Sequence, residues 1–302
     1  MAERLTFAVP EHLEGERLDR AVAVLGEMSR AAARRLVEDE QVEVDGRTLP
    51  PRTRLTAGQI VSFPPEEEAV ELRPEPVELE VVSEDHHFLV VEKPPGLVVH
   101  PGAGQREGTL AAGILHRYPR VEGVGQEGRW GLVHRLDRDT SGLMVVALSE
   151  EGYGSLRGQV SARTMEREYL ALVDGMFPVP TGTVDAPVSR DPARPTRFRV
   201  DPAGRPARTH YALEREYPAA GVSLIRARLE TGRTHQIRVH LGAIDHPLAG
   251  DSLYRPGPDR VEVPRLFLHA CRLAFDHPTT GERQEFQSPL PDDLAAALEH
   301  LP

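Results

Sequence analysis

The chain contains little cysteine, little lysine and no long apolar run. Cys271 is the single cysteine among 302 residues, so an internal disulfide is impossible and a cysteine-rich metal site is excluded. No apolar run is long enough to span a bilayer, and the N-terminus lacks the basic and apolar regions of a secretory signal. These absences predict a protein of the reducing cytoplasm without a membrane partner.

Lysine is almost entirely replaced by arginine. The 36 basic residues include one lysine, Lys93. Codon bias accounts for this without any function, although arginine also suits bidentate phosphate contacts and stacking on bases. The net charge of −11 arises within residues 1–92, whereas residues 93–302 carry 26 charges of each sign. The acidity is therefore local and does not exclude an RNA partner.

The length admits one large and one small domain. Residues 13–65 have the pattern of a small helix-helix-hairpin module. Residues 66–76 form an acidic, proline-bearing linker, and residues 77–302 would make the larger domain. Strands and helices mix there without a regular βα alternation, so we expect an α+β fold with a mixed, mainly antiparallel sheet flanked by helices and loops.

Hydrophobic periodicity and turn residues predict the individual elements. We expect helices at 17–26, 30–38, 109–116, 234–242 and 293–300, and strands at 42–44, 60–63, 77–82, 88–91, 143–148, 169–173, 223–229 and 273–275. Ser29 is a suitable cap for the helix that follows it. On that helix Arg30, Arg34 and Arg35 lie on neighbouring faces and could grip a phosphate backbone together. For an isolated helix, a solvated charged face is the plainer interpretation.

The densest polar segment is 134–143, which reads His-Arg-Leu-Asp-Arg-Asp-Thr-Ser-Gly-Leu. Polar residues rarely cluster directly before an apolar, β-branched run unless the turn presents a group to a ligand. Asp137 lies between Arg135 and Arg138, and nearby positive charge favours an ionised carboxylate. It therefore suits a nucleophile or electrostatic stabiliser better than a general acid. A structural Asp–Arg turn is an equally good interpretation of this segment alone.

A second polar segment, 231–240, reads Thr-Gly-Arg-Thr-His-Gln-Ile-Arg-Val-His. His235 and His240 are five residues apart and do not make the usual i,i+4 metal pair. A metal site that adds His134 and Asp137 to them is therefore disfavoured, and we expect none. Arg238 is better used as the salt-bridge partner of a carboxylate, in a catalytic or a purely structural ion pair.

Tyr169 is the third candidate. It follows a polar stretch and is expected to begin a strand, so its ring could stack on a base at the edge of a cleft. Packing in the core is the more common role of such a tyrosine. This residue alone decides nothing about function.

Together these segments resemble the RluA/RluD family of pseudouridine synthases over almost the whole chain. The matching segments are 93–96, 98–104, 134–143, 167–169, 231–240 and 246–251, with shorter matches at 268–270 and 288–291. Residues 13–65 resemble the S4 RNA-binding domain, and with this module the chain looks closest to the RluD type.

The resemblance implies the isomerisation of uridine to pseudouridine, in which the N1–C1′ bond breaks and the ribose rejoins at C5, without a cofactor. By matching, Asp137 is the essential carboxylate; it attacks C1′ or C6, or helps remove the C2′ proton. Tyr169 would stack on the target base, and Arg238 would pair with Asp137. Arg135 would help extrude the uridine and fill the space it leaves. Further RNA contacts are expected from His134 and Arg233.

The implied partner is the large-subunit (23S) ribosomal RNA, at its helix 69 stem-loop, as free RNA or in a pre-50S particle, with the protein acting as a cytoplasmic monomer. Three alternatives stay open. The same chemistry could act on other rRNA or tRNA uridines. A glycosidase could pair Asp137 with a second carboxylate. A non-catalytic RNA-binding or ribosome-assembly factor could keep the fold alone.

Overall fold

The computed structural model describes residues 4–65, 72–102, 105–126, 128–194, 196–255, 257–258 and 260–302. The chain divides into two compact units. The first comprises Met1–Ala69 and Asp185–Ala207, and the second comprises Val70–Val184 and Arg208–Pro302. Residues 66–71 of the expected linker lie outside the described residues. The grouping of Asp185–Ala207 with the N-terminal unit is a long-range feature that no local pattern indicates.

The N-terminal unit combines a small antiparallel sheet with two helices. Its elements are β1 (Leu5–Ala8), η1 (Glu11–Leu13), α1 (Leu18–Leu25), α2 (Arg30–Glu38), β2 (Glu43–Val44) and β3 (Ile60–Phe63), with strand order β1-β3-β2. Ser29 caps α2 as predicted, since its hydroxyl accepts a 3.1 Å hydrogen bond from the Ala32 N–H. The apolar sides of α1 and α2 pack with β3, where Val61 and Phe63 are fully buried.

A hairpin from the middle of the chain completes this unit. It consists of β9 (Val188–Arg190) and β10 (Phe198–Val200). Arg190 donates to the Glu40 carbonyl at 3.1 Å, and Arg205 donates to the Glu38 carbonyl at 3.1 Å. These carbonyls lie at the C-terminal end of α2, where helical partners are lacking and a cation is favoured.

The second unit is built on a nine-stranded sheet of order β4-β5-β6-β13-β7-β12-β11-β8, with β14 paired to β13. Its strands are β4 (Glu80–Glu84), β5 (Phe88–Lys93), β6 (Ser141–Ala147), β7 (Glu166–Asp174), β8 (Thr181–Asp185), β11 (Arg208–Tyr217), β12 (Val222–Leu229), β13 (Leu268–Asp276) and β14 (Arg283–Gln287). Strands β6 and β13 pair in parallel, whereas the pairs β4–β5, β5–β6, β13–β7, β7–β12, β12–β11 and β13–β14 are antiparallel. The α+β prediction with a mixed, mainly antiparallel sheet is confirmed.

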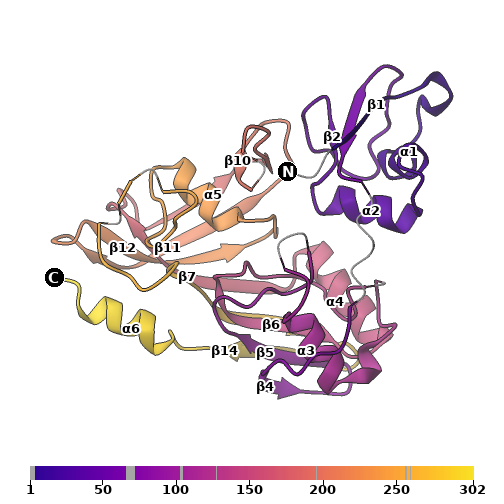
Figure 1. The fold of residues 1–302 in the computed structure, drawn as a ribbon. Coiled ribbons are helices and arrows are strands. Elements are labelled where there is room, and N and C mark those ends of the chain that lie inside the picture. The colour runs from indigo at the N-terminus through magenta and orange to yellow at the C-terminus, as the bar shows by residue number, and fades with distance from the viewer. Residues whose placement is uncertain are drawn as a thin grey trace. The chain divides into compact units, whose positions relative to one another are not determined.

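Helices cover this sheet and enclose its core. They are α3 (Leu110–Arg117), η2 (Pro119–Val121), α4 (Glu150–Ala162), α5 (Gln236–Ala243) and α6 (Asp292–Glu299). Helix α4 packs against β6 and β13, and α5 packs against β11 (Figure 1). Every residue of β6 is buried, which matches its apolar sequence. The strand that follows the Asp137 segment is thus anchored in the core. No helix in the described part of the chain is long and apolar enough to cross a membrane.

Candidate active site

The Asp137 loop is fixed by the start of strand β6. The Thr140 N–H donates to the Asp137 carbonyl at 3.2 Å, which closes a tight turn. Gly142 has φ +118°, and a Cβ there would lie 2.3 Å from the carbonyl oxygen of Ala270 on β13. Only glycine permits both this backbone conformation and this close approach. The Ser-Gly pair therefore lets the loop enter the sheet directly beside β13.

Lys93, the only lysine, also holds the loop that contains Asp137. Its side chain is fully buried, and its ammonium donates to the carbonyls of Pro94, Leu97 and Arg138 at 2.7, 2.9 and 2.8 Å. The Gly96 N–H also donates to the Arg138 carbonyl, at 2.9 Å. Burial lowers the pKa of Lys93 to about 8, while the charge of Asp137 opposes this shift. The motif at 93–96 thus anchors the residue next to Asp137.

Arg238 is held mainly by Asp251. Its Nε and Nη2 donate to the two Asp251 oxygens, each at 2.8 Å, while its Nη1 lies 3.5 Å from Asp137 Oδ2. Asp251 Oδ1 also accepts the N–H groups of Leu253 and Tyr254, both at 3.0 Å. The prediction that Arg238 pairs with Asp137 therefore describes the weaker of its two contacts. Sequence reasoning missed Asp251, although it ends the matched segment at 246–251.

The electrostatics of this ion pair favour full ionisation. Burial opposes the charge of Asp251, but the hydrogen bonds and charge of Arg238 outweigh burial and lower the pKa of the carboxyl. Burial likewise opposes the Arg238 charge, and Asp251 raises the pKa of the guanidinium. Asp251 has no exposed side-chain area, whereas the Asp137 side chain is 16% exposed. Asp137 is thus the carboxylate of this group that a substrate can reach.

The segment before Arg238 is positioned by Gln236. Its Oε1 accepts from the Thr231 hydroxyl at 2.7 Å and from the Arg233 N–H at 3.0 Å. Its Nε2 donates to the Arg208 carbonyl and to the Thr209 hydroxyl on β11, both at 3.0 Å. The helix begins at Gln236, two residues later than predicted, because this amide holds the preceding residues in a loop.

Tyr169 lies inside a strand. The prediction that it begins a strand is wrong, since β7 starts at Glu166. Its side chain is 5% exposed, and burial raises its pKa to about 12, with a further contribution from the charge of Asp137. The phenol is therefore neutral at physiological pH and close enough to Asp137 to interact electrostatically with it.

The other predicted contacts of this unit differ in exposure. Arg135 is exposed and has no hydrogen bond or ion pair among the described residues. His134 instead turns inward and accepts a 3.2 Å hydrogen bond from the Val145 N–H. Burial lowers its pKa to about 3, so the ring is neutral and not a cationic phosphate contact. Arg233 is partly exposed beside the Gln236 amide.

A cavity of about 390 Å³ opens next to these groups. Its lining residues are Pro95, Gly96, Asp139, Arg238, Gly250, Ser252, Arg265 and Leu266. Asp139 forms a surface pair with Arg138, at 2.9 Å. No cluster of three or more histidine, cysteine or acidic side chains in the described ranges has a metal-binding arrangement. The site can therefore supply a carboxylate, a fixed guanidinium and a neutral phenol.

The three arginines of α2 belong to the N-terminal unit. Arg30 lies 3.4 Å from the buried carboxylate of Asp19, which Arg17 also binds, at 2.8 Å. Arg34 pairs with Glu38 at 3.0 Å along the helix. Arg30 and Arg34 stay more than half exposed, whereas Arg35 is partly buried.

Comparisons with known proteins give a consistent family. The family profile for RNA pseudouridylate synthase matches residues 87–243. Ribosomal large subunit pseudouridine synthase D of Nitrosomonas europaea is 42% identical over 98% of this chain and 88% of its own. An RNA pseudouridine synthase of Chloroflexus aurantiacus is 45% identical over 99% of this chain and 94% of its own.

A solved structure agrees with these relatives. Human RNA Pseudouridylate Synthase Domain Containing 1 matches with a TM-score of 0.58 at 27% identity, and the match covers 77% of this chain and 90% of that one. The family profile spans the Asp137 loop, Tyr169 and Arg238. The chain belongs to the RNA pseudouridylate synthases, in the RluA/RluD family of isomerases.

Proposed function

We propose that this protein isomerises specific uridines of large-subunit ribosomal RNA, with Asp137 as the essential carboxylate. The observation that carries the proposal is the partly exposed Asp137 carboxylate beside an Arg238 guanidinium fixed by Asp251. A guanidinium that is held in place orients the carboxylate for attack on C1′ or C6 or for removal of the C2′ proton.

The neighbouring residues have matching roles in this proposal. Tyr169 stacks on the target base as a neutral phenol. Arg135, two residues before Asp137, is an exposed guanidinium with no ion pair to any described residue, which suits a residue that replaces an extruded uridine in the RNA stack. Extrusion is needed because a stacked base hides the N1–C1′ bond from the enzyme.

A glycosidase is less well supported. Such an enzyme needs a second carboxyl group that can act as acid or base in the same cleft. Asp251 is buried, bound to Arg238 and held ionised by a lowered pKa. Asp139 pairs with Arg138 at the surface. The lowered pKa of Asp251 is the opposite of what a general acid needs.

The N-terminal unit supports an S4-like role in RNA binding under this proposal. A surface depression there is lined by Arg17, Arg34, Glu38, Pro50, Pro51 and Arg52. Several guanidiniums around one depression suit phosphate oxygens of an RNA backbone. The names of the relatives favour large-subunit ribosomal RNA as the substrate. We propose helix 69, in free RNA or a pre-50S particle, as the site, and the cytoplasm as the compartment.

The test is to map pseudouridines in ribosomal RNA from a strain that lacks this gene. We expect pseudouridines in helix 69 to disappear and to return with the wild-type gene but not with Asp137→Ala. If pseudouridines disappear at other positions instead, the proposed reaction is supported and the proposed target site is wrong. An unchanged map would contradict the proposed function. Restoration by Asp137→Ala would contradict the role of Asp137 and favour a non-catalytic factor.

A further inference from the structure

Arg167 is a buried arginine for which the described residues supply no counterion. It lies on β7 and is 5% exposed, and its Nε is buried with no hydrogen-bond partner. Across the described part of the chain, no hydrogen bond or ion pair joins its guanidinium to another residue. An unpaired charge in the interior is unfavourable because the protein does not replace the water that it loses. Such a group needs a specific explanation.

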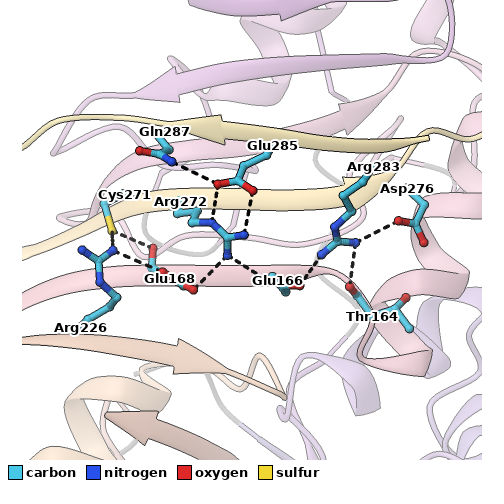
Figure 2. A network of polar contacts seen from close by, with 10 residues as sticks. All are labelled: Thr164, Glu166, Glu168, Arg226, Cys271, Arg272, Asp276, Arg283, Glu285 and Gln287. Carbon is cyan, nitrogen blue, oxygen red and sulfur yellow. Dashed lines mark hydrogen bonds and ion pairs between the residues drawn. The ribbon is translucent and has the colours of Figure 1, made fainter. Parts of the chain in front are cut away.

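On the opposite face of the same sheet, two arginines form ion pairs with carboxylates. Arg272 binds Glu166 at 2.7 Å, Glu168 at 3.0 Å and Glu285 at 2.8 Å (Figure 2). Arg283 binds Glu166 at 2.6 Å and Asp276 at 3.1 Å. Each of these guanidiniums is matched by carboxylates.

Alternation along β7 separates Arg167 from this network. Side chains of successive strand residues point to opposite faces, so Glu166 and Glu168 face the network while Arg167 and Tyr169 face the other way. Arg167 is therefore excluded from the carboxylates that its chain neighbours supply. It shares the face of Tyr169, the residue proposed to stack on the base.

Two further residues locate the guanidinium at the site. A Cβ at Gly232 would lie 3.0 Å from Arg167 Nη1, so glycine in the segment 231–240 leaves room for the guanidinium. His134, three residues before Asp137, has its pKa lowered first by burial and then by the charge of Arg167. Arg167 thus lies close to two other segments of the candidate site, 134–143 and 231–240.

The chemistry of the proposed function supplies a partner for this cation. When the N1–C1′ bond breaks, its electron pair stays with the uracil and spreads to the carbonyl oxygens. The C1′–C5 bond then forms with uracil electrons, the C5 proton leaves, and N1 takes up a proton, so no atoms are gained or lost. Attack of a carboxylate at C6 also places negative charge on a carbonyl oxygen. Each route therefore gives the uracil a transient negative charge.

We propose that the Arg167 guanidinium donates a hydrogen bond to a carbonyl oxygen of the target uracil and stabilises the charge that this oxygen gains. The inference rests on the proposed function and adds a catalytic residue to it. A donor fixed before the reaction, in a site with little water, stabilises such charge most effectively. A backbone phosphate is the less suitable acceptor, because only 5% of Arg167 is exposed whereas an extruded base can enter an interior pocket.

The test compares Arg167→Met with Arg283→Met, which removes a paired arginine from the other face of the sheet. Single-turnover pseudouridine formation on an rRNA transcript, the RNA dissociation constant and the melting temperature are measured for both. We expect Arg167→Met to react about 10²-fold more slowly. Its RNA affinity should stay within about twofold of wild type, and its melting temperature should be equal or higher, because an unpaired buried charge is gone. Arg283→Met should melt earlier and react at the wild-type rate.

Four outcomes would overturn the inference. An unchanged rate for Arg167→Met would remove its catalytic role. RNA affinity that falls as much as the rate would indicate a phosphate contact. A lower melting temperature for Arg167→Met with a proportionate loss of activity would indicate a structural role. If the wild type forms no pseudouridine, the proposed function fails, and the inference fails with it. The first three outcomes, with an active wild type, leave the proposed function intact.

Discussion

Asp251→Asn tests the ion pair that orients Arg238. The asparagine keeps the shape of the side chain and removes its charge, so the Arg238 guanidinium loses its main counterion. In the wild type, Asp251 has no exposed side-chain area and Arg238 is 9% exposed. Removal of one partner of a buried pair costs about 3–5 kcal/mol. We expect Asp251→Asn to lower the free energy of unfolding by about 3 kcal/mol, because the remaining amide oxygen still accepts hydrogen bonds.

A second substitution separates stability from activity. In Asp251→Asn with Arg238→Met, the unpaired cation is replaced by an apolar side chain, so part of the lost free energy of unfolding should return. Pseudouridine formation should not return, because no guanidinium then faces Asp137. We expect Asp251→Asn alone to react at least about tenfold more slowly, since a small displacement of a catalytic group lowers rates strongly.

Urea unfolding at pH 7 and single-turnover rates on an rRNA transcript measure these effects. A free energy of unfolding for Asp251→Asn within about 0.5 kcal/mol of wild type would show that Asp251 does not stabilise Arg238. A double variant that is less stable than Asp251→Asn by the full cost of Arg238→Met would also contradict the ion pair, because the two residues would then be energetically independent.

Two further predictions concern a buried lysine and a partly buried glutamate in the same unit. Lys93→Met should lower the free energy of unfolding by about 2–4 kcal/mol, because carbonyls that the ammonium satisfies become unpaired; thermal unfolding measures this, and an unchanged melting temperature would contradict it. Burial raises the pKa of Glu92 from 4.5 to about 7, so the folded state holds the proton more tightly and the wild type loses stability as the pH rises from about 4.5 to about 7. Glu92→Gln should not show this loss in urea unfolding over the same pH range, and parallel pH profiles would refute the assignment.

The candidate reactive residues could be predicted from the sequence because they lie in dense polar segments. Asp137 and Arg238 each stand in a run of polar residues whose local chemistry is unusual. The residues that hold these two side chains in place could not be predicted in this way. Lys93 holds the Arg138 carbonyl, 45 residues away, and Asp251 holds Arg238 from a separate loop. Such support depends on tertiary contacts, which local patterns do not encode.

The dependence on tertiary contacts also limits the prediction of the fold. Strands and helices with clear apolar periodicity, such as β3, β6 and α2, were predicted within two residues of their ends. The start of β7 was missed because Glu166 and Glu168 look like loop residues. Their charges are matched by Arg272 from β13, so polar residues are stable inside the sheet. The hairpin of β9 and β10 was missed because its partner, α2, lies about 150 residues earlier.

Tritium release from an rRNA transcript that carries uridine labelled at C5 measures the proposed isomerisation directly. Isomerisation replaces the C5–H bond with the C5–C1′ bond, so each turnover releases one tritium. We predict release by the wild-type protein and none by Asp137→Asn, with both proteins folded and binding the RNA with equal affinity. Tritium release by Asp137→Asn at the wild-type rate would contradict the central role of Asp137, and release of free uracil by the wild type would contradict the isomerisation itself.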